Sequence, residues 1–313
     1  MGTASRLLIV LALVQQGSPA AVSTPFEYAQ VHMGMEVRMR LYAPASPIAE
    51  SAATAAFARI AALDRMMSDY RPDSELRRLQ GNGDAWTPVS AELFDVLQRS
   101  VAIARKTDGA FDPTVGPLVR LWREARARRQ LPEPAALQVA KTQVGWRHVS
   151  LDPSRRAVRM AAEVALDLGG IAKGYILQEA LRELHTHGVS SALIEAGGDI
   201  VVGNAPPGRS GWRIEVPGAS AAFVARANDL TNAALSTSGP SAQYVEIDGV
   251  RYSHVIDPRT GLGLTNNLTA RVIAADAATA DALSTALTVA GSDRWRTIVT
   301  RFPHVVASVD RVQ

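Results

Sequence analysis

The sequence has no cysteine among its 313 residues, and only 5% of the residues are aromatic. The lack of cysteine excludes disulfide bonds, thiolate metal sites, cysteine nucleophiles, iron–sulfur clusters and lipid anchors attached through a thiol. The formal net charge is only +3, so the composition does not indicate a nucleic-acid-binding surface. The scarcity of aromatic side chains agrees with this, because single-stranded nucleic acids are bound on aromatic stacking platforms.

Long hydrophobic runs are also missing, although 47% of the residues are hydrophobic and a sizeable core is possible. Arg6 precedes a short apolar run at 7–14, and small residues occupy positions −3 and −1 of a cut after Ala20. This order is typical of a signal peptide, and the run is too short to span a bilayer. We therefore expect residues 1–20 to be cleaved and residues 21–313 to be a soluble periplasmic domain without a lipid anchor or transmembrane helix. The alternative is an ordinary N-terminus of a cytosolic protein.

Hydrophobic periodicity predicts a mixture of helices and strands. The pattern predicts helices at 48–67, 90–106, 114–129, 172–185 and 279–290. It predicts strands at 26–44, 158–166, 192–202, 212–216, near 235, and at 244–247, 251–256 and 269–274. Five arginines lie between Arg120 and Arg129, and a run of this kind usually forms a solvated helix face.

The first chemically informative segment is ALDLGGIAKGY at 165–175. A hydrophobic strand leads to Asp167, two glycines allow a tight turn, and Lys173 opens a helix. Glycines let a ligand approach the backbone, and a helix N-terminus favours an anion. The spacing is neither that of a Walker loop nor Gly-x-Gly-x-x-Gly. The alternative is a structural strand–turn–helix in which the lysine has no function.

A second segment, GAFDPTVGPL at 109–118, holds Asp112 in a loop made rigid by proline. Asp112 could contact a ligand or could simply cap the following helix. In a third segment, His254 is expected in a strand that runs into the Asp-Pro-Arg-Thr-Gly turn at 257–261, downstream of Thr-Ser-Gly at 237–239. This placement favours a binding site at the rim of the sheet, although a lone histidine is usually structural.

A fourth segment, ADALSTAL at 280–287, places Asp281 and Thr285 one helical turn apart, so both oxygens face the same side. Two side-chain oxygens without histidine or cysteine suit Mg²⁺ better than Zn²⁺ or Ca²⁺. Because Mg²⁺ usually keeps waters and phosphate oxygens as ligands, so sparse a site predicts a phosphate-bearing ligand. Asp281 could alternatively serve as a helix cap.

Eight motifs in order resemble the ApbE family of FAD:protein FMN transferases, or flavin transferases, from about Met33 to Gly291. They are Met33-Gly34, MSDYRPDSEL at 67–76, GAFDPT at 109–114, DLGGIAKG at 167–174, Gly-Gly-Asp at 197–199, Thr-Ser-Gly at 237–239, His254-x-Ile-Asp-Pro and ADALST at 280–285. The resemblance implies an α+β fold of mixed sheets and packed helices that forms one integrated catalytic unit.

The resemblance also implies a set of site residues. The positions that match FAD-contacting residues are Met33, Tyr70, Ala110, Phe111, Asp112, Asp167, Lys173 and His254. Lys173 would oppose the charge of the diphosphate, and His254 would be the leading candidate for the general base. Mg²⁺ would be held by the carbonyl of Gly170 together with Asp281 and Thr285.

The implied reaction is protein flavinylation. A Ser or Thr hydroxyl of an acceptor protein, such as a redox-pump subunit or another periplasmic flavoprotein, attacks the flavin-side phosphorus of FAD. AMP leaves, and FMN stays on the acceptor as a phosphoester. Two alternatives remain open: a Mg²⁺-dependent FAD pyrophosphatase, in which water replaces the hydroxyl, and a non-catalytic periplasmic flavin-binding protein.

Overall fold

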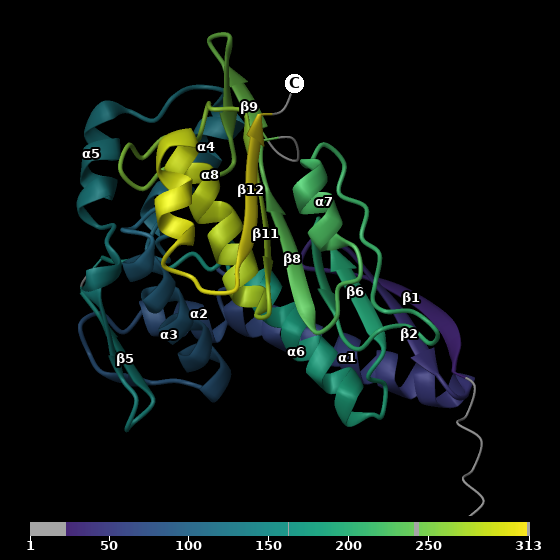
Figure 1. The fold of residues 1–313 in the computed structure, drawn as a ribbon. Coiled ribbons are helices and arrows are strands. Elements are labelled where there is room, and N and C mark those ends of the chain that lie inside the picture. Colours follow the sequence, from purple (N-terminus) through teal and green to yellow (C-terminus); the bar gives the residue numbers. More distant parts are fainter. Residues whose placement is uncertain (1–22, 162, 241–243, 312–313) are drawn as a thin grey trace, which may run out of the picture.

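The computed structural model describes residues 23–161, 163–240 and 244–311 (Figure 1). The predicted signal peptide lies outside these ranges. The α-helices within them are α1 Ser46–Met67, α2 Glu75–Gln80, α3 Ala91–Lys106, α4 Gly116–Arg128, α5 Pro134–Thr142, α6 Ala172–Thr186, α7 Ala221–Ala227 and α8 Ala277–Val299. A short 3-10 helix spans Trp146–His148. No helix in the described part of the chain is long and apolar enough to cross a membrane.

The strands form three sheets. The strands are β1 Thr24–His32, β2 Met35–Ala43, β3 Thr87–Pro88, β4 Val149–Asp152, β5 Ala157–Met160, β6 Ala192–Ala196, β7 Asp199–Val202, β8 Ala233–Ser238, β9 Tyr244–Ile247, β10 Val250–Ser253, β11 Leu268–Ala274 and β12 Val306–Arg311. The largest sheet has the order β1-β2-β6-β7-β8-β11-β12, and the smaller sheets are β3-β5-β4 and the hairpin β9-β10. All pairs of these strands are antiparallel. The predicted α+β class is confirmed.

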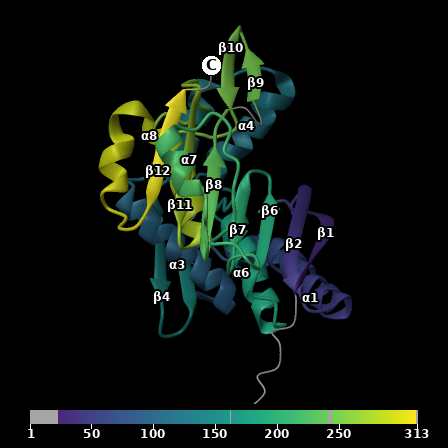
Figure 2. The ribbon, with the colours of Figure 1, turned by 45° about the vertical axis from the view of Figure 1, so that its right-hand side comes forward.

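Side-chain alternation gives the large sheet two buried faces. On β7, Val201 belongs to the main core under α1, α6 and α8, whereas Val202 packs in a second cluster with Phe223 of α7. Figure 2 shows α1 and α6 along the sheet near β2 and β6. A third cluster joins α4 and α5 to the β9–β10 hairpin through Leu118 and Ile247, among others. The large sheet therefore supports the helices, which bring residues from distant parts of the sequence close together.

Two predicted strands prove to be hairpins. The segment 26–44 folds as β1 and β2 around Met33 and Gly34, which have φ angles of 52° and 74°. The segment 192–202 folds as β6 and β7 around Gly197 and Gly198, which also have positive φ. Such two-residue turns match the twist of the flanking strands. Because a turn of two residues preserves the alternation of period two, the hydrophobic pattern continues through it and hides it.

Other predicted boundaries also change. Predicted strand 158–166 ends at Met160, and residues 212–216 form only an isolated bridge from Trp212 to Leu230. The last helix extends to Val299 across a kink at Gly291. Helices α2, α5 and α7 and strands β3, β4 and β12 were not predicted, since most of them are too short for a clear period. The remaining predicted elements are present with small shifts at their ends.

Candidate active site

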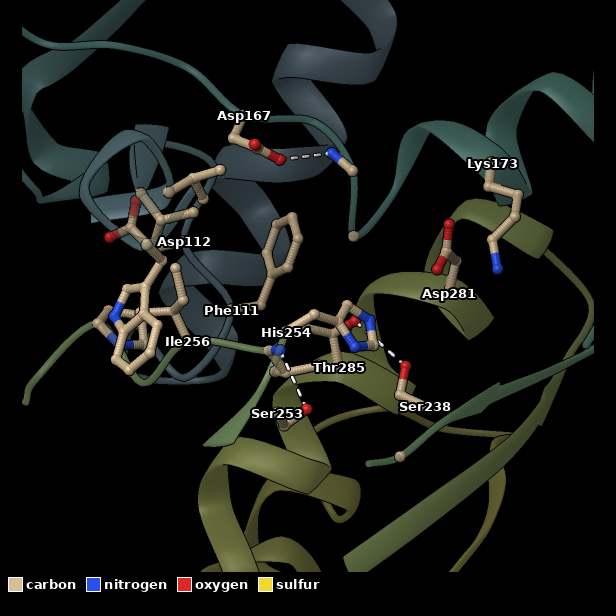
Figure 3. Close-up of a pocket in the computed structure, with 18 of the residues that line it drawn as sticks. Phe111, Asp112, Asp167, Lys173, Ser238, Ser253, His254, Ile256, Asp281 and Thr285 are labelled. Carbon is tan, nitrogen blue, oxygen red and sulfur yellow. Dashed lines mark hydrogen bonds between the residues drawn. The ribbon is translucent and has the colours of Figure 1, made fainter. Parts of the chain in front are cut away.

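One cavity of about 550 Å³ collects residues from distant parts of the sequence (Figure 3). Residues from every chemically informative segment line it, namely Tyr70, Ala110, Phe111, Asp112, Asp167, Gly170, Lys173, Ser238, His254, Asp281 and Thr285. The cavity lies between the main core and the cluster formed by α4, α5 and the β9–β10 hairpin. Its volume suits a ligand of small-molecule or cofactor size.

Close packing of α6 against α8 brings Lys173 to Asp281. A Cβ at Gly174 would overlap the carbonyl of Ala277 and lie 2.9 Å from the Cβ of Asp281, so glycine is required there. The Gly174 N–H donates to Asp281 Oδ2 at 2.9 Å. Burial raises the pKa of Asp281 to about 7, and Asp199 adds to this, while Lys173 opposes it. The carboxylate is therefore costly in the absence of a further cation.

A chain of hydroxyl groups lies behind the metal-ligand candidates. Asp199 Oδ1 accepts from Ser236 Oγ at 2.5 Å, and Ser236 Oγ lies 3.1 Å from Ser284 Oγ. Ser238 Oγ is 2.7 Å from Ser284 Oγ. It is also 3.3 Å from Thr285 Oγ1, and Figure 3 shows these two side chains facing each other. The chain thus connects β7 and β8 to α8 and restricts the rotation of the Thr285 hydroxyl.

The Phe111 loop is held in place by Asp112, whose oxygens are used within the protein. Asp112 Oδ1 accepts from the Thr114 N–H and hydroxyl at 2.9 and 2.6 Å, and Oδ2 accepts from the Trp146 N–H at 2.9 Å. Burial raises the pKa of Asp112, and these hydrogen bonds oppose the rise. The capping alternative is wrong, because α4 begins at Gly116 with Val115 as its N-cap. Asp112 fixes the loop that presents Phe111.

A cluster around Arg123 forms another wall of the cavity. Its guanidinium lies 4.0 Å from the ring centroid of Tyr70, donates to Asp69 at 2.5 Å, and is 3.7 Å from Asp167 Oδ2. Burial raises the pKa of Asp167, and the charge of Asp69 raises it further; the Gly169 N–H and Arg123 oppose the rise. The arginine run is thus more than a solvated face, because Arg123 orders the side chains around it.

The prediction that His254 lies within a strand is wrong, because β10 ends at Ser253 and His254 follows it directly. The adjoining turn is fixed by Asp257, which accepts from the Arg259 N–H at 2.9 Å and from its guanidinium. Trp122 of α4 donates to the Gly261 carbonyl at 2.7 Å and so joins this turn to the cavity wall. The imidazole is exposed and lines the cavity beside Thr285 (Figure 3).

The candidate ligands for Mg²⁺ lie together. Gly170 lies against α8, because a Cβ on it would be 3.3 Å from Thr285 Oγ1. Asp281 and Thr285 share one side of α8, and both line the cavity. In the described residues no group of three or more His, Cys, Asp or Glu could hold a metal. A set of one carboxylate, one hydroxyl and one carbonyl suits Mg²⁺, which retains waters and substrate oxygens.

Met33 is the one predicted site residue outside the lining of the cavity. It sits in the β1–β2 turn, where its N–H donates to Asp64 at 3.3 Å. Met35, which follows the turn as the first residue of β2, does approach the cavity wall, because a Cβ at Gly197 would lie 2.7 Å from its Sδ. No sequence pattern selects Arg123, since its partners Asp69, Tyr70 and Asp167 are all more than 40 residues away and become visible only in the fold.

The fold and the cavity define an α+β protein whose site combines a partly buried lysine ammonium, an oxygen-rich set of side chains and an exposed imidazole. The ApbE family sequence model matches residues 33–309. The chain therefore belongs to the ApbE family.

Individual relatives agree with this assignment. The FAD:protein FMN transferase of Treponema pallidum is 32% identical over an alignment 325 residues long, gaps included. The alignment covers 96% of this chain and 89% of the relative. The crystal structure of the Pseudomonas stutzeri flavinyl transferase ApbE in its apo form aligns with a TM-score of 0.80 at 27% identity, covering 95% of this chain and 94% of that one. The ApbE protein of Thermotoga maritima gives a TM-score of 0.78 at 29% identity, over 93% and 97% of the two chains.

Proposed function

We propose that the protein catalyses Mg²⁺-dependent transfer of FMN from FAD to a Ser or Thr hydroxyl of an acceptor protein, with release of AMP. The observation that carries the proposal is the meeting of Lys173, the Asp281 and Thr285 pair and His254 in one cavity of about 550 Å³. Flavin transferases with about 32% identity over most of the chain support the choice of substrate.

The diphosphate of FAD would bind between α6 and α8. Lys173 supplies a positive charge there, with its side chain 20% exposed toward the cavity. The Gly170 carbonyl, Asp281 and Thr285 would hold Mg²⁺, which would offset the negative charge that develops on the transferred phosphoryl group. Positioning and electrostatics account for most catalysis of phosphoryl transfer.

The aromatic parts of FAD would bind on the other side of the cavity. Tyr70 is 75% exposed, and Arg123 covers one face of its ring. Its other face is then available to stack on a ring of the dinucleotide. Phe111 and Ala110 add apolar surface from the loop that Asp112 fixes. Met33 would contact FAD from the neighbouring β1–β2 turn.

His254 would act as the general base. The acceptor oxygen attacks the flavin-side phosphorus, its proton passes to the imidazole, and the bond between phosphorus and the AMP oxygen breaks with its electron pair on AMP. The exposed position of His254 at the cavity favours this role, because the acceptor hydroxyl has to arrive from outside. General bases of this kind contribute roughly 10²–10⁴-fold in rate.

The test is to incubate the protein with FAD, Mg²⁺ and a candidate acceptor, and to weigh the acceptor by mass spectrometry. A gain equal to one FMN phosphoester, with AMP released, supports the transferase. FMN and AMP without a gain would instead identify a pyrophosphatase. Unchanged FAD under every metal tested would leave only a flavin-binding protein.

We also propose that the protein is exported to the periplasm by residues 1–20 and works there without a lipid anchor. Support comes from the basic, apolar and small-residue order of this segment. N-terminal sequencing of the protein recovered from cells should then begin at Ala21, and an intact Met1 would refute export.

A further inference from the structure

Asp199 is a buried carboxylate that the proposed reaction does not use directly. It is the first residue of β7, immediately after the Gly197-Gly198 turn, and is only 2% exposed. The two glycines and Lys173 line the cavity, whereas Asp199 does not. The carboxylate therefore lies in a layer behind the side chains that meet the ligand.

The two oxygens of Asp199 have different partners. Oδ1 accepts from Ser236, and Oδ2 lies 2.8 Å from the Lys173 ammonium. No other donor in the described part of the chain reaches Oδ2. Separating a buried carboxylate from the one cation beside it leaves an uncompensated buried charge, which is strongly unfavourable. The ion pair therefore favours conformations in which the Lys173 ammonium stays next to Asp199.

Lys173 needs such a partner. Its ammonium sits on a flexible four-carbon stem, so the charge has no fixed position unless another group holds it. Burial alone would lower the pKa of Lys173, but Asp199 and, to a smaller extent, Asp281 outweigh this and keep the pKa above its usual value. The ammonium has three N–H donors, so its ion pair with one carboxylate oxygen does not use up its capacity to bind a ligand in the cavity that Lys173 lines.

We propose that Asp199 is the positioning residue for Lys173, holding its ammonium in place toward the diphosphate of the bound dinucleotide. The inference rests on the proposed function for the identity of the ligand. It differs from it in that Asp199 touches neither substrate nor metal and acts through Lys173. Loss of the Asp199 carboxylate should therefore weaken the binding of ligands that carry phosphates. The binding of a flavin without phosphates should not change.

The test compares the binding of FAD and of riboflavin to the full chain without added metal, by quenching of flavin fluorescence. Asp199→Asn should weaken FAD binding about 10- to 100-fold, as expected for loss of an outer-layer carboxylate. Riboflavin binding should stay within about twofold, since it has no diphosphate for Lys173 to contact. Equal loss for both flavins would show a general collapse of the cavity and overturn the proposal, as would unchanged FAD binding.

Two single variants serve as matched controls. Ser236→Ala keeps the Lys173 ion pair and removes the second partner of Asp199 together with the contact to Ser284, so FAD binding without metal should stay within about threefold. Asp310→Asn breaks another carboxylate–cation pair of the same sheet, with Arg271 at 3.0 Å, and should leave both flavins unaffected. A loss of FAD binding with Asp310→Asn as large as with Asp199→Asn would overturn the proposal.

A double-mutant cycle separates positioning from folding. Lys173→Met should weaken FAD binding, and Asp199→Asn added to it should cause little further loss, because the residue to be positioned is gone. The double variant also removes the buried pair as a unit and keeps the test valid if Asp199→Asn alone fails to fold. Independent, additive losses would overturn the proposal. If the wild-type chain binds FAD in this way but modifies no acceptor, the proposed transfer fails while Asp199 keeps its role.

Discussion

Asp281 should destabilise the metal-free protein, and replacing it with Asn should make that protein more stable. The carboxylate is 3% exposed, and burial raises its pKa from 3.8 to about 7. Between these two values the folded protein binds more protons than the unfolded protein, so its stability falls as the pH rises. The penalty reaches its full size above the folded-state pKa.

The magnitude follows from linkage. A rise of about three pKa units is worth about 4 kcal/mol at pH 8 as an upper bound, and about 2 kcal/mol at pH 5. In Asp281→Asn the amide oxygen can still accept from the Gly174 N–H, so the penalty disappears and the hydrogen bond stays. The stability advantage of the variant should therefore grow by about 2 kcal/mol between about pH 5 and about pH 8.

The assay is urea unfolding in the presence of a chelator at these two pH values. Asp152→Asn is a suitable control, because the pKa of Asp152 is lowered to about 2 by Ser154 and Arg155. Both pH values lie above that pKa, so this variant should lose the same stability at each. An advantage of Asp281→Asn that is absent, or equal at both pH values, would refute the reasoning. Added Mg²⁺ should stabilise the wild-type chain and not the variant.

Three further predictions concern the walls of the cavity. Arg123→Met should raise the KM for FAD about two- to fivefold through loss of the contact to Tyr70, whereas Arg128→Met on the same helix should not. His254→Ala should lower kcat by roughly 10²–10⁴-fold in the acceptor assay, a larger effect than loss of its contact to FAD has on the KM; an unaltered kcat would exclude it as the base. Gly174→Ala should lower the free energy of unfolding by about 1–3 kcal/mol in urea, because its Cβ would meet a carbonyl of α8, and wild-type stability would contradict that packing.

The long amphipathic helices were predictable because their periods are long enough to read. Helices α1, α3 and α6 begin and end within a few residues of their predicted limits. The hairpins around Met33-Gly34 and Gly197-Gly198 were not, since a two-residue turn leaves the alternation intact. The glycines within these strand patterns could have indicated the turns, because residues with positive φ are most often glycine.

The candidate site was predictable where one segment carries its own chemistry. Asp281 and Thr285 lie one turn apart on a single helix, so their common face follows from helical geometry. Contacts between residues of different segments could not be predicted from the sequence. Asp69 and Arg123 are 54 residues apart, and neither residue type nor spacing indicates that they meet.

The turn that hid a hairpin from the hydrophobic pattern is also what makes Asp199 useful. A continuous strand over 192–202 would carry the chain past the cavity, whereas the Gly197-Gly198 reversal places two glycines at the wall and returns the chain at Asp199. Asp199 then lies behind Lys173, which α6 brings to the same place through its contact with α8 at Gly174. Glycine has a different part at each point, since Gly197 and Gly198 adopt the positive φ of the reversal, whereas Gly174 lets α6 come close to α8. Substitutions at these glycines should therefore impair the Lys173 geometry even though no glycine atom carries charge.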